Sequence, residues 1–227
     1  MKIALIGYGK MGHMIEQVAL LRGHEIVCTI DVNEENKFDS DAFRSADVAI
    51  EFSTPGTAEA NVRRAWKQGV PVVCGTTGWN AQALIVESQK SKVESGKDML
   101  IWSSNFSVGV NIFFELNKWL AEVIRHYPQY QPHIYEEHHI HKLDKPSGTA
   151  KTLAEQIEEK LQTTNKKPQT AYYEVPIESV REGEIPGNHS VIWDSPEDTI
   201  VISHMAKGRE GFALGAVLAA ESLNPKR

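Results

Sequence analysis

The stretch between positions 133 and 150 gathers side chains that could move protons and hold an anion. Four of the nine histidines of the chain fall between His133 and His141, and Lys142 follows them directly. Histidine exchanges its proton near neutral pH, which suits it to general acid and base catalysis. Cationic groups crowded together repel one another unless an anion lies among them. The pattern therefore indicates a site for a small anionic molecule.

A short polar run follows this cluster and opens a predicted helix at residues 149–161. It contains Ser147, Gly148 and Thr149, directly after Pro146. Free backbone N–H groups at a helix start, together with two hydroxyls, suit a carboxylate. Ser147 or Thr149 could instead be an ordinary helix cap, and capping is compatible with carboxylate binding. We therefore expect these residues to bind part of a substrate.

His139 and His141 also have a spacing that metal ligands use, because residues two apart share one face of a strand. The chain has only two cysteines, Cys28 and Cys74, and they match no metal-binding spacing. No third ligand lies at a useful spacing from the histidine pair. We therefore expect no metal. A solvated, histidine-rich strand remains the alternative for any single histidine here.

A second motif, near the N-terminus, has the spacing G-x-G-x-x-G. It lies between a predicted strand at 2–7 and a predicted helix at 11–21, the context that a dinucleotide-binding turn requires. The glycines allow a tight turn and close approach of a pyrophosphate to the helix start, and Asp31 ends the next strand, where an acid binds ribose hydroxyls. A glycine-rich turn without a ligand is the alternative. The residues assigned to the dinucleotide here are Gly7, Tyr8, Gly9, Lys10, Met11, Gly12 and Asp31.

The elements that position this motif alternate between strand and helix. Strands are predicted at residues 2–7, 25–30, 48–52, 70–74 and 99–102, with helices at 11–21, 57–68 and 80–92 between them. This alternation predicts a Rossmann-type α/β domain with a doubly wound parallel sheet. Ligands bind such sheets at the carboxyl ends of the strands. Further cofactor-binding candidates follow the fourth and fifth strands: Gly75, Thr76, Thr77, Ser103, Ser104, Asn105 and Phe106.

The pattern changes after residue 104. Helices are predicted at 110–126 and 149–161, and strands at 133–139, 172–177, 190–193 and 199–204. Clustered strands indicate a second α+β domain with a mixed sheet, at residues 105–204. A helix at 212–223 is expected to return to the first domain, which then comprises 1–104 and 205–227. The polar stretch 163–170 is interpreted as a surface loop.

Composition limits the classes of function. The net charge is −6 and the sequence pI is about 5.9, so nothing supports nucleic-acid binding through a basic domain. No apolar stretch is long enough to span a membrane or to form the core of a signal peptide. Two distant cysteines are typical of a reduced, cytoplasmic protein. We expect a cytoplasmic protein without nucleic-acid or membrane partners.

These segments together resemble the dihydrodipicolinate reductase (4-hydroxy-tetrahydrodipicolinate reductase) family. The resemblance covers nearly the whole chain, and its most specific part is the run 137–150. It implies that His138 and Lys142 carry the chemistry, that His139, Gly148 and Thr149 hold the substrate, and that the loops named above bind the nucleotide. The resemblance also includes residues 7–12, 51–55, 75–78, 105–111, 209 and 212–216.

The activity implied by the resemblance is reduction of 4-hydroxy-tetrahydrodipicolinate (dihydrodipicolinate) to tetrahydrodipicolinate with NAD(P)H, in diaminopimelate and lysine biosynthesis. The substrate is a cyclic dicarboxylate, and His138 is the expected proton donor, with Lys142 close by. One alternative is another small Rossmann-fold reductase or an amino-acid dehydrogenase, for which the 138–149 block has no counterpart. A second is a redox-sensing regulator, but the sequence has no basic helix-turn-helix pattern.

Two departures from the family pattern bear on the coenzyme. The glycine loop is a residue shorter than in many members, and Val32 stands where a basic residue often follows the acid. Asp31 repels a 2′-phosphate, and Val32 and Asn33 offer it no cation. We therefore expect NADH to be preferred and NADPH to be used as well, with Lys10 as the nearby cation that could compensate.

The resemblance also implies a homotetramer joined through the sheet of the second domain. A domain of about 100 residues has little room to bury many large apolar side chains alone. Its predicted strands carry six such residues: Val191, Ile192, Trp193, Ile200, Val201 and Ile202.

Overall fold

The chain builds one folded unit, continues into a second and returns to the first. The computed structural model describes residues 1–95, 99–162 and 174–223. The first unit comprises Met1–Val108 and Arg209–Arg227, and the second comprises Gly109–Gly208. The second domain expected from the sequence, 105–204, has nearly the same bounds.

Five parallel strands form the sheet of the first unit, in the order β2-β1-β3-β4-β5. Helices alternate with them along the chain, so the predicted Rossmann-type doubly wound sheet is confirmed. The strands are Lys2–Ile6 (β1), Glu25–Ile30 (β2), Val48–Glu51 (β3), Val72–Cys74 (β4) and Leu100–Trp102 (β5). The helices are Lys10–Leu21 (α1), Asp41–Arg44 (α2), Ala58–Lys67 (α3) and Gln82–Ser95 (α4), with a 3₁₀ helix at Glu35–Asp39.

Apolar side chains project from both faces of this sheet because successive residues of a strand point in opposite directions. In β1, Ala4 and Ile6 pack into one buried cluster, while Ile3 and Leu5 pack into another. Helix α7 (Glu210–Leu223) contacts α1 and adds several side chains, among them Val217, to the second cluster. A helix distant in sequence therefore completes the core of the first unit.

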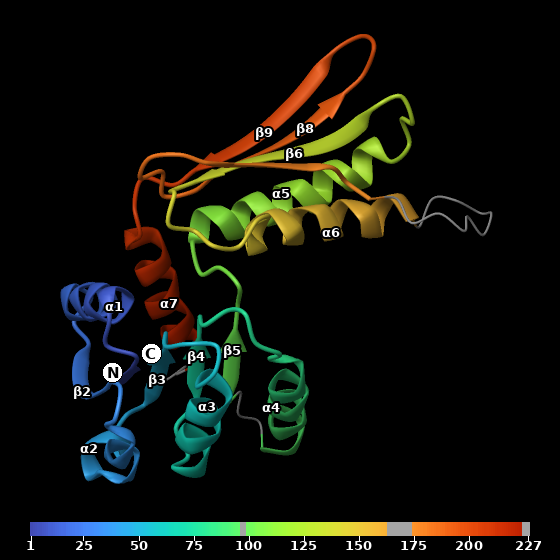
Figure 1. Cartoon of the computed structure of the whole chain (residues 1–227). Coiled ribbons are helices and arrows are strands. Elements are labelled where there is room, and N and C mark those ends of the chain that lie inside the picture. Colours follow the sequence, from blue (N-terminus) through green and yellow to red (C-terminus); the bar gives the residue numbers. More distant parts are fainter. Residues whose placement is uncertain (96–98, 163–173, 224–227) are drawn as a thin grey trace. The chain divides into compact units, whose positions relative to one another are not determined.

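Four strands form the sheet of the second unit, in the order β7-β6-β8-β9. The strand β6 (Gln131–His138) runs parallel to β7 (Ile177–Arg181) and antiparallel to β8 (Asn188–Asp194), which pairs antiparallel with β9 (Thr199–Met205). The predicted mixed sheet is confirmed. Helices α5 (Val108–Ile124) and α6 (Gly148–Gln162) cover one face of it, and the core lies between (Figure 1).

The strand order sends one connection across the carboxyl end of β6. Because β7 and β8 flank β6 on opposite sides, residues 182–187 between them must cross it; we call them the crossing segment. Glu182 N donates to the His138 carbonyl at 2.8 Å, and His139 N donates to the Ile185 carbonyl at 2.8 Å. The crossing segment is therefore fastened over the end of the strand that carries His138.

The strand predicted at 172–177 is wrong. Residues 174–176 have no strand structure, and β7 begins at Ile177. Pro176 has no N–H to donate to a sheet, so the strand starts after it. The polar run 163–170 and residues 172–173 lie outside the described residues. The 3₁₀ helix and α2 were not predicted, because neither is long enough to show a helical period.

Candidate active site

The predicted dinucleotide motif forms the turn between β1 and α1. Gly7 has a φ of +85°, and a Cβ on it would come within 2.1 Å of the Phe52 carbonyl oxygen. A Cβ on Gly12 would come within 2.4 Å of the Gly7 carbonyl oxygen, so only glycine lets α1 pack this closely on the turn. At Gly9 a Cβ would meet nothing within 4 Å. The turn is tight on its inner side and open at Gly9.

Helix α1 begins beyond Gly9 without a capping side chain among the described residues. The first N–H groups of an α-helix have no partner within the helix. Lys10, Met11 and Gly12 supply them here. A phosphate at this point would accept from these groups and meet the positive end of the helix dipole. The residues present therefore fit the pyrophosphate of a dinucleotide.

The side chain of Tyr8 turns back onto α1. Its hydroxyl donates to the Glu16 carboxylate, and its ring centroid lies 4.1 Å from that of His13. The part of Tyr8 that can line the turn is therefore its main chain.

Asp31 is exposed at the carboxyl end of β2, where the motif places an acid. Its N–H donates to Glu34 Oε2 at 3.0 Å, and this carboxylate pairs with Lys37 Nζ at 2.7 Å. Lys37 also donates to the Thr29 carbonyl at 3.1 Å. Glu34 and Lys37 were not predicted from the sequence. They place a second acid beside Asp31 and hold a nearby lysine in an ion pair.

Thr76 joins the loop after β4 to the loop after β3 and to the end of β5. Its hydroxyl accepts from Ser53 N at 2.9 Å. Its carbonyl accepts from the indole N–H groups of Trp79 at 2.8 Å and Trp102 at 3.1 Å. Thr76 is buried and Thr77 is exposed, so Thr77 is the residue of this loop whose hydroxyl can meet a ligand directly.

The residues after β5 are mostly engaged within the first unit. Ser103 Oγ donates to the Asn105 carbonyl at 2.7 Å, and Asn105 Oδ1 accepts from Ser107 N at 2.8 Å. Phe106 is buried in the same apolar cluster as α7, so only its main chain can line a nucleotide site. Ser103 and Ser104 are half-buried and remain accessible.

A buried carboxylate that was not predicted lies beneath these loops. Glu51 is fully buried, contacts the Ser53 hydroxyl and accepts from Cys74 Sγ at 3.0 Å. Its carbonyl accepts from Gly75 N at 2.9 Å. Burial raises the pKa of the Cys74 thiol, and the charge of Glu51 raises it further. Cys74 therefore stays protonated and serves as a structural donor.

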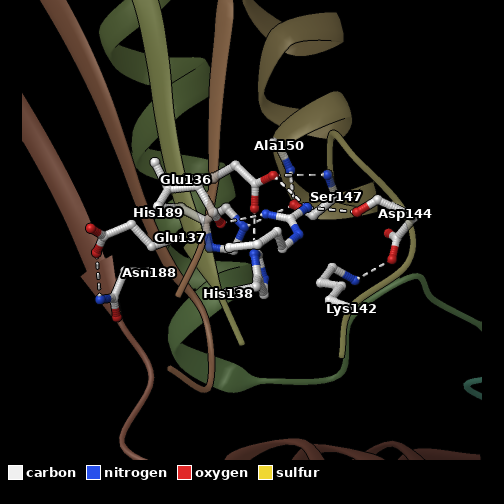
Figure 2. Close-up of polar contacts among 11 residues, drawn as sticks. Glu136, Glu137, His138, Lys142, Asp144, Ser147, Ala150, Asn188 and His189 are labelled. Atoms are coloured by element: carbon white, nitrogen blue, oxygen red, sulfur yellow. Dashed lines mark hydrogen bonds and ion pairs between the residues drawn. The ribbon is translucent and has the colours of Figure 1, made fainter. Parts of the chain in front are cut away.

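In the second unit, Glu136 and His138 project from β6 toward the side that α5 and α6 cover. Glu136 is fully buried, and its Oε2 contacts His138 Nδ1 as an ion pair. Its Oε1 accepts from Arg181 Nη2 at 2.9 Å and from Ser147 N at 3.3 Å (Figure 2). Burial would raise the pKa of Glu136, but hydrogen bonds from His138 and Arg181 outweigh burial and hold it well below its usual range. Glu136 is therefore ionised.

The predicted substrate loop lies at the start of α6. Ser147 Oγ accepts from Ala150 N at 3.2 Å, as a helix cap does, and lies 3.1 Å from His189 Nε2. Burial, reinforced by His138, lowers the pKa of His189 to about 3, so this ring is neutral at physiological pH. Gly148 is exposed and Thr149 is buried at this helix start.

Lys142 and His138 belong to one network, although no contact within the described part of the chain joins them directly. Lys142 Nζ lies 2.7 Å from Asp144 Oδ1. Arg181 Nη2, which binds Glu136, also donates to the Asp144 carbonyl at 2.6 Å. One guanidinium therefore connects the strand of His138 to the loop of Lys142.

His139 is half-buried beside His141, with 5.9 Å between ring centroids. A different group has the geometry of metal ligands: possible ligand atoms of Glu136, His138 and His189 lie within 4.8 Å of one another. The Glu136 carboxylate of this group already pairs with the Arg181 guanidinium, and this positive charge repels a metal cation at the same carboxylate. Arg181 therefore disfavours a metal at this group, and the absence of a metal stays a prediction.

Four residues of this cluster were not predicted: Glu136, Asp144, Arg181 and His189. Glu136 had a signal, because a residue two positions before His138 on a strand shares its face. Arg181 and His189 had no such signal in the sequence, because they reach this cluster through the register of neighbouring strands. Arg181 pairs with His138 across β6 and β7, and His189 pairs with Glu136 across β6 and β8.

This fold and these two clusters of residues define the class of protein, which is an oxidoreductase that uses a nicotinamide dinucleotide. Residues 1–106 match the family model "Dihydrodipicolinate reductase, N-terminus", and residues 109–227 match "Dihydrodipicolinate reductase, C-terminus". The chain belongs to the dihydrodipicolinate reductase family. A 4-hydroxy-tetrahydrodipicolinate reductase from Christiangramia forsetii is 46% identical, covering 100% of this chain and 93% of the relative. One of the same name from Archaeoglobus fulgidus is 34% identical, covering 97% and 93%.

Solved structures share the fold. The dipicolinate-bound dihydrodipicolinate reductase from Paenisporosarcina sp. TG-14 has a TM-score of 0.73 and 21% identity, covering 98% of this chain and 94% of that one. Aspartate semialdehyde dehydrogenase from Vibrio cholerae has a TM-score of 0.59 and 12% identity, covering 99% and 98%. The fold thus serves more than one reaction, and the site residues must decide the chemistry.

Proposed function

We propose that the chain reduces 4-hydroxy-tetrahydrodipicolinate (dihydrodipicolinate) to tetrahydrodipicolinate with NAD(P)H, in the diaminopimelate route to lysine. The observation that carries this proposal is that His138 and Ser147 both contact the Glu136 carboxylate, in a chain that matches the family in both halves. The relatives that match along its length are named for this reaction. A related structure with dipicolinate bound supports a small cyclic dicarboxylate as the ligand.

In this proposal the first unit binds the dinucleotide and the second binds the substrate. The 4-hydroxyl of the substrate leaves as water, which gives a cyclic conjugated imine, and NAD(P)H, when bound, would supply a hydride to that imine. The ring of His138 donates a proton to the reduced substrate, and Lys142 leaves its ion pair with Asp144 to oppose the negative charge that develops. Gly148 and Thr149 hold one carboxylate at the start of α6, with His139 and Ser147 beside them.

The test is loss of NADH absorbance when the purified protein meets the condensation product of pyruvate and aspartate semialdehyde. Reductive amination of pyruvate or oxaloacetate serves as the comparison, because an amino-acid dehydrogenase would use such substrates. Turnover of the cyclic substrate alone supports the proposal. Turnover of a keto acid and ammonia alone refutes it.

For the coenzyme, the proposal is a preference for NADH with NADPH also used. Two acids support it, because Asp31 and Glu34 lie where a 2′-phosphate would approach. Lys37, a cation that could have met this phosphate, is held by Glu34 and the Thr29 carbonyl. A higher kcat/KM with NADPH than with NADH would contradict the preference.

For assembly, the proposal is a homotetramer that uses the sheet face opposite α5 and α6. Val191, Trp193, Ile200 and Ile202 pack on the helix side, where Val191 and Trp193 are fully buried and Ile200 and Ile202 are half-buried, so the second domain does not bury all six residues alone. By strand alternation, Ile192 and Val201 project from the opposite face together with Met205, and Val201 and Met205 are exposed. This smaller apolar set supports the interface.

Light scattering tests the assembly. A tetramer has about four times the chain mass of 25.4 kDa. The double variant Val201→Glu/Met205→Glu should lower this mass, because it places charges on the exposed face. Leu21→Glu, at an exposed residue of α1 in the first unit, is the matched control. A monomeric wild type at micromolar concentration would refute the tetramer.

The proposed location is the cytoplasm. Cys28 and Cys74 are both buried and free of disulfides, as a reducing compartment favours. No helix in the described ranges is long and apolar enough to cross a membrane. Fractionation of cells that produce the protein would test the location.

A further inference from the structure

We propose that Glu136 is a positioning residue for His138, which it holds as the Nδ1–H tautomer so that Nε2 is the atom that exchanges a proton with the substrate. This inference rests on the proposed function, in which His138 is the proton donor. Glu136 contacts Nδ1, which is not the nitrogen assigned to proton exchange, so it acts through His138.

The geometry joins one oxygen of Glu136 to one nitrogen of His138. Residues 136 and 138 stand next to each other on the same face of β6, and Glu136 Oε2 contacts His138 Nδ1. This contact is an ion pair whose geometry lies outside that of a hydrogen bond, and within the described residues it is the polar contact that Nδ1 makes. Both side chains are buried, so water does not compete for this contact.

Chemistry then decides which nitrogen carries the hydrogen. An ionised carboxylate can only accept, so Nδ1 must donate. Glu136 stays ionised because Arg181 Nη2 donates to its other oxygen at 2.9 Å, and Ser147 N does so at 3.3 Å. The low pKa of Glu136 agrees with this. The tautomer of His138 is therefore fixed by Glu136, whose negative charge is stabilised by two neighbours, Arg181 and Ser147.

The surroundings leave His138 as the ring that can take part in proton exchange. His189 packs edge-on against it, with 5.0 Å between centroids, but its Nε2 is engaged with Ser147. On the opposite side, Glu137 turns away to accept from Asn188 Nδ2 at 3.0 Å (Figure 2). Glu137 thus offers a matched control: an adjacent carboxylate of the same strand that points to the other face.

The direct test is nitrogen NMR on the wild-type protein labelled with ¹⁵N-histidine, in EDTA and at alkaline pH, where imidazole is neutral. The signals that disappear in the His138→Gln variant are those of the His138 ring. We expect hydrogen on Nδ1 and an unprotonated Nε2. Hydrogen on Nε2 of the neutral ring would overturn the inference. This measurement needs no altered residue at position 136, so it does not depend on how a variant folds.

The second test compares Glu136→Gln with Glu137→Gln. Glu136→Gln should mix the two tautomers of His138 and lower kcat about 100- to 1,000-fold, within the range for lost acid catalysis, without weakening NADH binding. Glu137→Gln should retain both the tautomer and kcat. A merely structural Glu136 would lower the melting temperature and leave the tautomer unchanged, which would count against the inference.

The two proposals fail in different ways. Full turnover by His138→Gln would remove the proposed role of His138, whatever its tautomer. An inactive His138→Gln combined with the Nε2–H tautomer in the wild type would remove only the role of Glu136.

Discussion

The ring of His138 lies directly against Gly187: a Cβ on this glycine would come within 3.0 Å of Nε2 and 3.2 Å of Cδ2. Gly187 is the last residue of the crossing segment and has a φ of +144°, a conformation that side chains rarely adopt. Its place follows from the strand order, which carries this segment over the end of β6. A side chain at position 187 would therefore press against the ring, which would have to shift by a few tenths of an ångström.

Gly187→Ala should lower kcat by up to about tenfold, since a displacement of about 1 Å in a catalytic group can cost about 100-fold and the ring here would shift by only a few tenths of an ångström. NADH binding should not change. Steady-state kinetics and NADH titration measure the two effects. The control is Gly183→Ala in the same segment, where φ is +50° but a Cβ would meet nothing within 4 Å. Equal losses in both variants would show that backbone strain, and not contact with His138, is responsible.

His138→Gln and Lys142→Ala should each lower kcat by about tenfold to several-thousandfold, the range for lost acid–base catalysis. The Kd for NADH should stay near the wild-type value, because both residues belong to the second unit and not to the nucleotide loops. Stopped-flow turnover and fluorescence titration test this. Near-wild-type turnover in both variants would exclude the assignment.

Thr149→Ala should mainly raise the KM for the substrate. Thr149 lies buried in the first turn of α6, where it is expected to bind a carboxylate equally in the ground and transition states. The measurement is kcat and KM at saturating NADH. Lys151→Ala, one of the exposed residues of the same helix, is the control. A fall in kcat with an unchanged KM would instead place Thr149 in the chemical step.

Glu34→Gln should raise the ratio of kcat/KM for NADPH to that for NADH about tenfold, equivalent to about 1.4 kcal/mol. The variant removes one negative charge beside Asp31 and frees Lys37 from its ion pair. Glu35→Gln alters the neighbouring exposed acid and should leave the ratio unchanged. No change in Glu34→Gln would show that Lys37 cannot reach the 2′-phosphate.

Stability should fall as the pH drops below about 6.5, and His189 should contribute to the fall. Its pKa is lowered to about 3 in the folded protein by burial, whereas the unfolded chain binds this proton near pH 6.5. Between these values protonation favours the unfolded state, by up to about 1.4 kcal/mol per pH unit. Burial lowers the pKa of His204 as well, so it acts in the same direction.

Urea unfolding at pH 7, 6 and 5 measures this slope. His189→Gln should flatten it, because glutamine carries no proton to exchange, while the exposed His126 offers a control as His126→Gln. The carboxylate Glu136 adds its own loss only at lower pH, since its pKa is depressed and its unfolded value is about 4.3. An identical slope in wild type and His189→Gln would contradict the assignment.

Local patterns predicted the parts of the fold and site that depend on local rules. The turn from Gly7 to Gly12 could be predicted because tight turns and helix starts have fixed residue requirements. In the cluster around His138, Lys142 and the residues from Ser147 to Thr149 could be predicted from their closeness in the sequence, and strand alternation along β6 links His138 to Glu136. Arg181, Gly187 and His189 arrive through pairing of strands far apart in the chain, and no local pattern encodes register.

The lack of a local signal for tertiary packing also explains why the sequence could not show which apolar residues of β8 and β9 are free for the proposed interface. Six apolar residues in β8 and β9 looked alike in the sequence, but the strands alternate, so most of them face the helices. Which face of a strand is covered depends on where α5 and α6 pack, which is a tertiary property.

The place of α7 in the first unit has a consequence for how the protein emerges from the ribosome. Residues 1–108 are synthesised first, yet the cluster around Ile3, Leu5 and Ile15 lacks Ala213 and Val217 until α7 has been made. The second unit draws its core from one continuous stretch of chain and can be completed earlier. The nascent first unit therefore has an apolar surface uncovered until α7 is made, and during this interval the chain is most exposed to aggregation and to capture by chaperones.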